Sequence, residues 1–120
     1  MYNIVRIGDR DVPMLSKATV DFYYKSIFGE DPIRIQAKSG SDEGAMIDLM
    51  LKMGFVMAKF AESTHRKDMM TLNEDAFFEW LDGFERADLY AVLDDIQATY
   101  ESQAIAGSKA KKNNEEPTET

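Results

Sequence analysis

The residues of this chain best equipped for chemistry are its carboxylates, which concentrate between residues 73 and 102. That stretch holds nine of the 22 acidic side chains and, of the 14 basic ones, only Arg86. The rest of the chain is balanced, so this stretch accounts for the whole formal charge of −8. A carboxylate pair working in acid–base catalysis needs one member desolvated. Asp94-Asp95, close to Asp88, has no flanking pattern that would bury it, which favours a solvated face.

Other catalytic and ligand-binding motifs are missing from the sequence. There is no D-x-D-x-D-G calcium loop ending in glutamate and no G-x-x-x-x-G-K-[ST] phosphate loop. The chain has no cysteine, and nothing in the sequence pairs its single histidine, His65, with a nucleophile. We therefore expect a protein that is not an enzyme, with no catalytic residues, no metal and no cofactor.

Composition limits the class of protein. With 120 residues, 44% of them hydrophobic, the chain can bury one modest core without disulfides. The absence of cysteine favours the cytosol, and the first residues lack the pattern of a signal peptide. Asp48, Lys52 and Lys59 interrupt the most apolar stretch, so no membrane span is expected. The acidic balance argues against nucleic acid as a partner.

Periodicity and turn residues predict a mainly α (α+β) fold: a small N-terminal β-hairpin followed by a compact four-helix bundle. We expect one domain over residues 1–106. Residues 107–120 contain no apolar side chain larger than alanine and are predicted to be a flexible tail. The predicted elements are a hairpin at 2–14 with its turn at Gly8-Asp9, a helix from Ser16 or Thr19 to Phe28, and a loop at 30–41 with a short extended piece at 33–35. Pro32 and Gly40 are the residues that indicate this loop. There follow a helix at 42–61, a polar connection at 62–72, a helix at 73–83 and a last helix from about Asp88.

Helical spacing also selects candidate partner contacts. The 42–61 helix is apolar nearly all round, and Phe55 falls on its narrow polar line. An exposed Phe55 would be a partner contact, and burial under another element is the alternative. Phe22 falls off the apolar stripe of its own helix. The predicted partner-binding residues are Phe22, Phe55, Met69 and Met70 for apolar contacts, with Glu79, Asp82, Asp94 and Asp95 for electrostatic contacts.

Three stretches, taken in order, resemble the tail assembly chaperones of long-tailed (siphovirus-type) phages and prophages. The N-terminal strand, with Gly8 and then Pro13-Met14, is also similar to the opening of that family. The three stretches are TVDFYYKSIFGEDPI (Thr19 to Ile33), MLKMGFVMAKFAES (Met50 to Ser63) and FFEWLDGFERADLYAVLDDI (Phe77 to Ile96).

The resemblance implies a function in tail morphogenesis. Proteins of this family bind the long, aggregation-prone tape measure protein, keep it soluble and help recruit tail tube subunits. It also implies a location in the host cell cytoplasm and absence from the mature virion. Many members exist in a second, longer form made by programmed ribosomal frameshifting, which meets the tail tube protein. Ala110-Lys111-Lys112-Asn113 is a candidate position for such a frameshift.

Two other functions fit the composition. One is a small acidic adaptor or inhibitor that masks a basic protein surface, favoured by the charge concentrated between residues 74 and 101. The other is a structural head–tail component, which would be present in purified particles. The sequence leaves self-association open.

Overall fold

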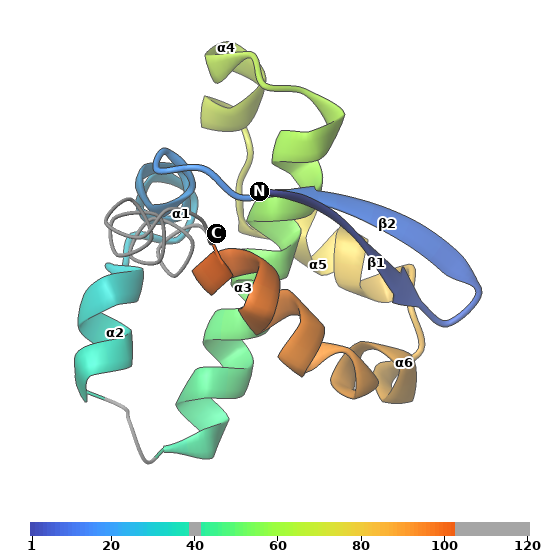
Figure 1. Ribbon diagram of the computed structural model, residues 1–120. Helices are drawn as coiled ribbons and strands as arrows, with labels where there is room; N and C mark the ends of the chain where they lie inside the picture. Colours follow the sequence, from blue (N-terminus) through green and yellow to red (C-terminus); the bar gives the residue numbers. More distant parts are fainter. Residues whose placement is uncertain (39–41, 103–120) are drawn as a thin grey trace, which may run out of the picture.

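A computed structural model describes residues 1–38 and 42–102 of the chain. Within them, a two-stranded antiparallel hairpin precedes a set of packed helices (Figure 1). The predicted fold class is therefore confirmed. The predicted tail at 107–120, including the candidate frameshift position, lies outside the described residues. The elements are β1 (Tyr2–Ile7), β2 (Arg10–Leu15), α1 (Val20–Phe28), α2 (Pro32–Lys38), α3 (Glu43–Glu62), α4 (Arg66–Met70), α5 (Glu74–Asp82) and α6 (Arg86–Ala91), followed by a further helical segment at 93–102, here called the terminal helix.

The hairpin closes through the predicted Gly8-Asp9 turn. Ile7 pairs with Arg10, so the loop has two residues, and Gly8 has φ 63°. A positive φ at the first turn position suits a tight hairpin and costs glycine little. A Cβ on Gly8 would lie 2.6 Å from the Oδ2 atom of Asp88. Glycine therefore serves both the turn and its close approach to α6.

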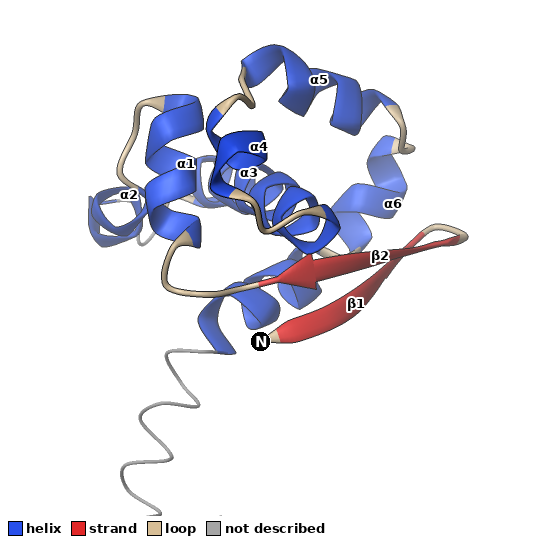
Figure 2. Ribbon diagram, turned by 90° about the horizontal axis from the view of Figure 1, so that it is seen from above, coloured by secondary structure: helices blue, strands red, loops and turns tan. Residues whose placement is uncertain are grey.

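Helix α3 forms the centre of the molecule. Nine of its 20 residues are buried. Strand β2 and helices α1, α2 and α5 contact it, and α5 and the terminal helix lie on opposite sides of it (Figures 1 and 2). This central position explains the nearly continuous apolar surface from Leu49 to Phe60, where all nine buried residues lie, since a helical stretch covered by its neighbours can be apolar all round.

Local capping chemistry sets the helix ends that the sequence predicted. The Asp42 side chain accepts a hydrogen bond from the Ala45 amide, and the Asn73 side chain accepts one from the Ala76 amide. Each bond satisfies an amide of the first helical turn that would otherwise lack a partner. At the end of α1, Gly29 adopts φ 69° and its amide bonds to the carbonyl of Lys25, as a left-handed C-cap does.

Two predicted connections contain short helices. In the predicted loop at 30–41, the Asp31 carboxylate accepts a hydrogen bond from the Ile33 amide at 3.0 Å, and Pro32 begins α2. An aspartate followed by proline is a helix start as well as a turn signal. The loop assignment and the extended piece at 33–35 were therefore wrong, because these residues are helical. The polar connection at 62–72 contains α4, which buries Met69.

The last predicted helix differs from the prediction in its start and in its continuity. It begins at Arg86 instead of Asp88 and is interrupted at Val92. The terminal helix then crosses α3 at Gly54, where a Cβ would lie 3.1 Å from the Cδ1 atom of Ile96. Its end is tied to the hairpin by the side-chain amide of Asn3, whose Nδ2 atom donates to the Thr99 hydroxyl at 2.9 Å. The bundle thus has more helical segments than the four predicted.

In the described part of the chain, no helix is both long enough and apolar enough to cross a membrane.

Candidate interaction surface

Helix α5 presents an exposed aromatic side chain surrounded by carboxylates. Phe78 is 55% exposed, and helical spacing places Glu74, Asp75 and Asp82 on its side of the helix, at i−4, i−3 and i+4. Glu79 follows directly, and all four carboxylate residues are exposed. These five residues are called the acidic α5 surface below. It offers an apolar contact in a negative field, which suits a segment that is both apolar and basic.

Aromatic packing on the opposite side of α5 sets the position of this surface. On the opposite side of α5, Phe77 is buried against Phe55 of α3, with ring centroids 5.5 Å apart, and Trp80 lies 5.9 Å from the same ring. Phe28 of α1 completes the cluster, 5.3 Å from Phe77. Edge-on aromatic contacts of this kind hold helices in a defined orientation. Phe78 is thereby fixed facing outward.

The four predicted electrostatic contacts are exposed, but they do not form one cluster. Glu79 and Asp82 belong to α5, whereas Asp94 and Asp95 belong to the terminal helix. Helix α3 lies between these two helices (Figure 2). The acidic stretch therefore supplies two separate negative surfaces. Asp94 also lines a groove of about 530 Å³ between the terminal helix and the start of α3.

Two of the four predicted apolar contacts are exposed and lie together. Phe22 is 66% and Met70 51% exposed. Both line a groove of about 380 Å³ between α1 and α4, here called the α1–α4 groove, whose other lining residues are Thr19, Tyr23 and Arg66.

The other two predicted contacts, Phe55 and Met69, were wrong because their side chains are only 0% and 1% exposed. For Phe55 the alternative, burial under another element, is confirmed. The polar line of α3 does not face solvent at Phe55, because α5 and Phe28 cover it. Met69 points inward from α4, a helix absent from the prediction. These two residues stabilise the core and are withdrawn as partner contacts.

Sequence reasoning missed three exposed aromatic residues: Tyr2 on β1, and Phe78 and Tyr90 on helices. Tyr90 is 41% exposed, and the Arg86 guanidinium lies 5.1 Å from its ring centroid. The signal was present in the helical spacing: Phe78 falls outside the stripe that begins at Phe77, and Tyr90 falls outside the stripe that begins at Leu89.

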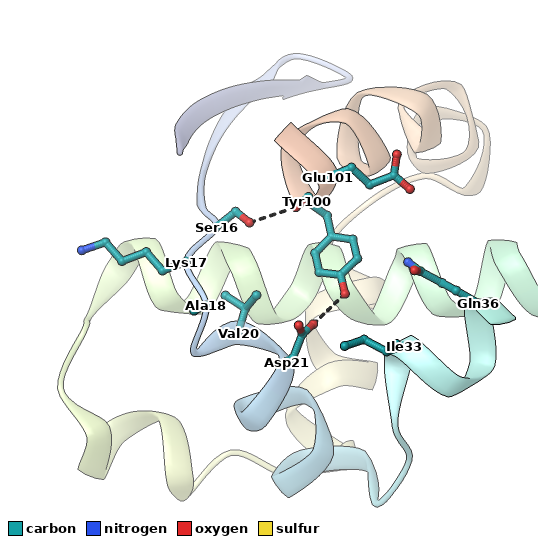
Figure 3. A pocket seen from close by; sticks show the side chains of 9 residues that line it. All are labelled: Ser16, Lys17, Ala18, Val20, Asp21, Ile33, Gln36, Tyr100 and Glu101. Atoms are coloured by element: carbon teal, nitrogen blue, oxygen red, sulfur yellow. Dashed lines mark hydrogen bonds between the residues drawn. The ribbon is translucent and has the colours of Figure 1, made fainter. Parts of the chain in front are cut away.

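A pocket of about 380 Å³ lies where the terminal helix meets α1 and α2 (Figure 3). The Tyr100 hydroxyl donates to the Asp21 carboxylate at 2.6 Å, and the Ser16 hydroxyl donates to the Tyr100 carbonyl at 3.2 Å. Burial, together with the hydrogen bond to Asp21, raises the pKa of Tyr100 above its usual range. Ser16 was a predicted cap of α1, but Thr19 holds that position, without a side-chain cap bond. These polar groups bind one another and fasten the terminal helix to α1.

Within residues 1–38 and 42–102, no three His, Cys, Asp or Glu side chains gather into a group that could hold a metal ion.

Comparison with known proteins gives no match: no family model fits the chain, and neither a curated protein nor a solved structure is significantly similar to it.

Proposed function

We propose that this protein is a non-catalytic tail assembly chaperone of a long-tailed phage or prophage. In this role it binds and solubilises the tape measure protein in the host cytoplasm and helps recruit tail tube subunits, in part through a frameshifted longer form. It leaves before the virion is complete. The observation that carries the proposal is the acidic α5 surface, on which Phe78 is exposed among carboxylates.

The contacts of the three motifs that carry the family resemblance support the proposal. The three motifs fall on α1 and the start of α2, on α3, and on α5, α6 and the start of the terminal helix. Phe28, Phe55 and Phe77, one from each motif, lie with ring centroids 5.3–6.2 Å apart. The motifs therefore build one core, and that core positions the acidic α5 surface.

The acidic α5 surface suits a partner that is helical and partly apolar. A tape measure protein is a long helical chain whose apolar stripes associate with one another when left uncovered. An exposed phenylalanine on a rigid helix can cover such a stripe, while the carboxylates select segments with lysine or arginine beside it. Net negative charge keeps the complex of many chaperones on one partner soluble.

Co-expression with the neighbouring tape measure protein tests the proposal. We expect the tape measure protein to move into the soluble fraction and to co-purify with this chain. Phe78→Ser combined with Glu79→Lys should lower the co-purified amount without changing the fold. Ile33→Ser is the matched control, because Ile33 is 59% exposed on α2, outside the acidic α5 surface. A tape measure protein that stays insoluble, even with the longer form present, refutes the proposal.

The concentrated charge supports a second candidate, an acidic adaptor that masks a basic protein surface. Both negative surfaces would then contribute, and Asp94→Lys with Asp95→Lys should weaken binding as strongly as changes on α5. A salt-sensitive complex with a nucleic-acid-binding enzyme would favour this function over the chaperone. A structural head–tail component is distinguished by its presence in purified particles.

A further inference from the structure

We propose that the α1–α4 groove is a second docking site, which takes an acidic amphipathic helix of a partner protein. Its charge preference is opposite to that of the acidic α5 surface. The inference rests on the groove itself and does not depend on the identity of the protein as a chaperone.

The groove combines exposed apolar rims with a buried floor. Phe22 from α1 and Met70 from α4 form the rims. Tyr23, which is only 6% exposed, forms part of the floor and packs on Phe60 of α3, with ring centroids 5.6 Å apart. Helices α1 and α4 are in contact, and the two lie side by side (Figure 2).

The groove is held open by residues that cannot move independently of the core. Met69, next to the rim residue Met70, is buried and anchors α4. A hydrogen bond of 2.7 Å between the Ser63 hydroxyl and the Asp68 carboxylate ties α4 to the end of α3. A preformed groove spares a ligand the cost of ordering it, which raises affinity for a given contact area.

Positive charge flanks the groove on both helices. The Lys25 ammonium lies 4.9 Å from the ring centroid of Phe22, and Arg66 lines the groove one helical turn before Met70. Lys67 is next to Arg66 and is exposed. Within the described residues, the ion pairs involve Arg6, Lys52 and Lys59, and none involves these three cations. The one carboxylate of α4, Asp68, accepts the bond from Ser63.

Shape and charge together identify the occupant. An apolar groove between two helices accepts the apolar stripe of a third helix, with anchors at i, i+3 or i+4, and i+7. Cations on both sides favour Asp or Glu beside that stripe and disfavour Lys or Arg. A basic helix would meet like charge at Lys25 and Arg66, so it belongs on the acidic α5 surface.

Two synthetic peptides test the assignment. They share one leucine stripe in a helical register and differ only in carrying Glu or Lys at the flanking positions. Each is labelled with a fluorophore, and its binding to the full chain is measured by anisotropy. The Glu peptide should bind, and Phe22→Asp should raise its Kd about tenfold or more, as expected for a central apolar contact. The double variant Lys25→Glu, Arg66→Glu should weaken binding of the Glu peptide and strengthen binding of the Lys peptide.

A matched control separates this site from the other surface. Phe78→Asp introduces the same charge at an exposed phenylalanine of α5 and should leave Glu-peptide binding unchanged. Circular dichroism checks whether each variant is folded. Met70→Asp provides a second variant if Phe22→Asp does not fold.

Three results would overturn the proposal. The first is equal binding of the Glu and Lys peptides that Phe22→Asp weakens to the same extent, and the second is Glu-peptide binding that survives both Phe22→Asp and Met70→Asp. The third is self-association in sedimentation velocity that Phe22→Asp abolishes, because the occupant would then be a second copy of the chain. None of these experiments uses the tape measure protein, so their failure leaves the co-expression result standing.

Discussion

Phenylalanines have opposite roles at different positions of this protein: some build the core and others are exposed. Phe55 has 0% exposure and lies among the rings of Phe28, Phe77 and Trp80. Phe22, two-thirds exposed, contacts mainly solvent and the ammonium group of Lys25. Both were predicted as partner contacts from the same reasoning about helical faces. Only the neighbours supplied by other helices distinguish them.

Replacing these two residues by alanine should therefore have different effects on stability. Phe55→Ala removes a buried ring and leaves a cavity, so we expect the free energy of unfolding to fall by about 3–5 kcal/mol. Phe22→Ala should change it by no more than about 0.5 kcal/mol, as for other surface substitutions. Urea unfolding of both variants measures the difference. A Phe55→Ala variant as stable as the parent would contradict the packing of α5 on α3.

At the scale of elements, the contact between the terminal helix and α1 makes stability depend on pH. The raised pKa of Tyr100 means that, above pH 10.0, the usual tyrosine value, the unfolded chain releases this proton while the folded chain retains it. The unfolded state then binds fewer protons, so this contribution to stability falls as pH rises. Tyr100→Phe lacks the titration. Its deficit in unfolding free energy relative to the parent should be largest near about pH 8 and shrink towards about pH 11.

Denaturant unfolding at several pH values measures this deficit. Asp21→Asn is the companion variant: it removes the carboxylate that the Tyr100 hydroxyl contacts, so the parent's loss of stability above pH 10.0 should be smaller in it. A Tyr100→Phe deficit that stays constant across this range would show that the phenol titrates alike in both states.

The elements also show which parts of the fold could be predicted from sequence. The ends set by Asp42, Asn73 and Gly29 depend on hydrogen bonds within a few residues, so local sequence was sufficient. Helix α2 was missed because Pro32 was interpreted only as a breaker, although Asp31 before it caps the helix. Burial of Phe55 depends on α5, which is distant in sequence, and no periodicity within α3 could reveal it.

The candidate surfaces also have some features that the sequence predicted and others that it could not reveal. Exposure of the carboxylates was predicted, because helical spacing places them off the apolar stripes of their helices. Their separation onto two sides of α3 follows from the break at Val92 and the crossing at Gly54, which no local pattern indicates. The α1–α4 groove needs α4, a five-residue helix in a segment whose polar composition resembles a loop. Phe78 could have been found, because its position off the apolar stripe is visible in the sequence.

At the scale of the whole molecule, the last turn of the terminal helix connects the end of the described chain to its N-terminal part. The Tyr100 hydroxyl donates a hydrogen bond to Asp21, and the Tyr100 carbonyl accepts one from the Ser16 hydroxyl. One residue therefore ties the end of the terminal helix to the start of α1 and to the segment before α1. Residues 107–120 contain no apolar side chain larger than alanine. By composition they have little to bury, and burial of apolar area is the main source of stability.

Two truncations should therefore behave differently in thermal unfolding. A chain that ends at residue 106 should keep the melting temperature of the full chain. A chain that ends at residue 99 loses both Tyr100 contacts, and its melting temperature should fall by at least about 4 °C, because 1 kcal/mol corresponds to about 4–8 °C in a domain of this size. A lowered melting temperature for the chain that ends at residue 106 would place part of the stabilising contacts beyond that residue. Equal melting temperatures for both truncations would show that the terminal helix folds against α3 without its last turn, with Ile96 at Gly54 as its main anchor.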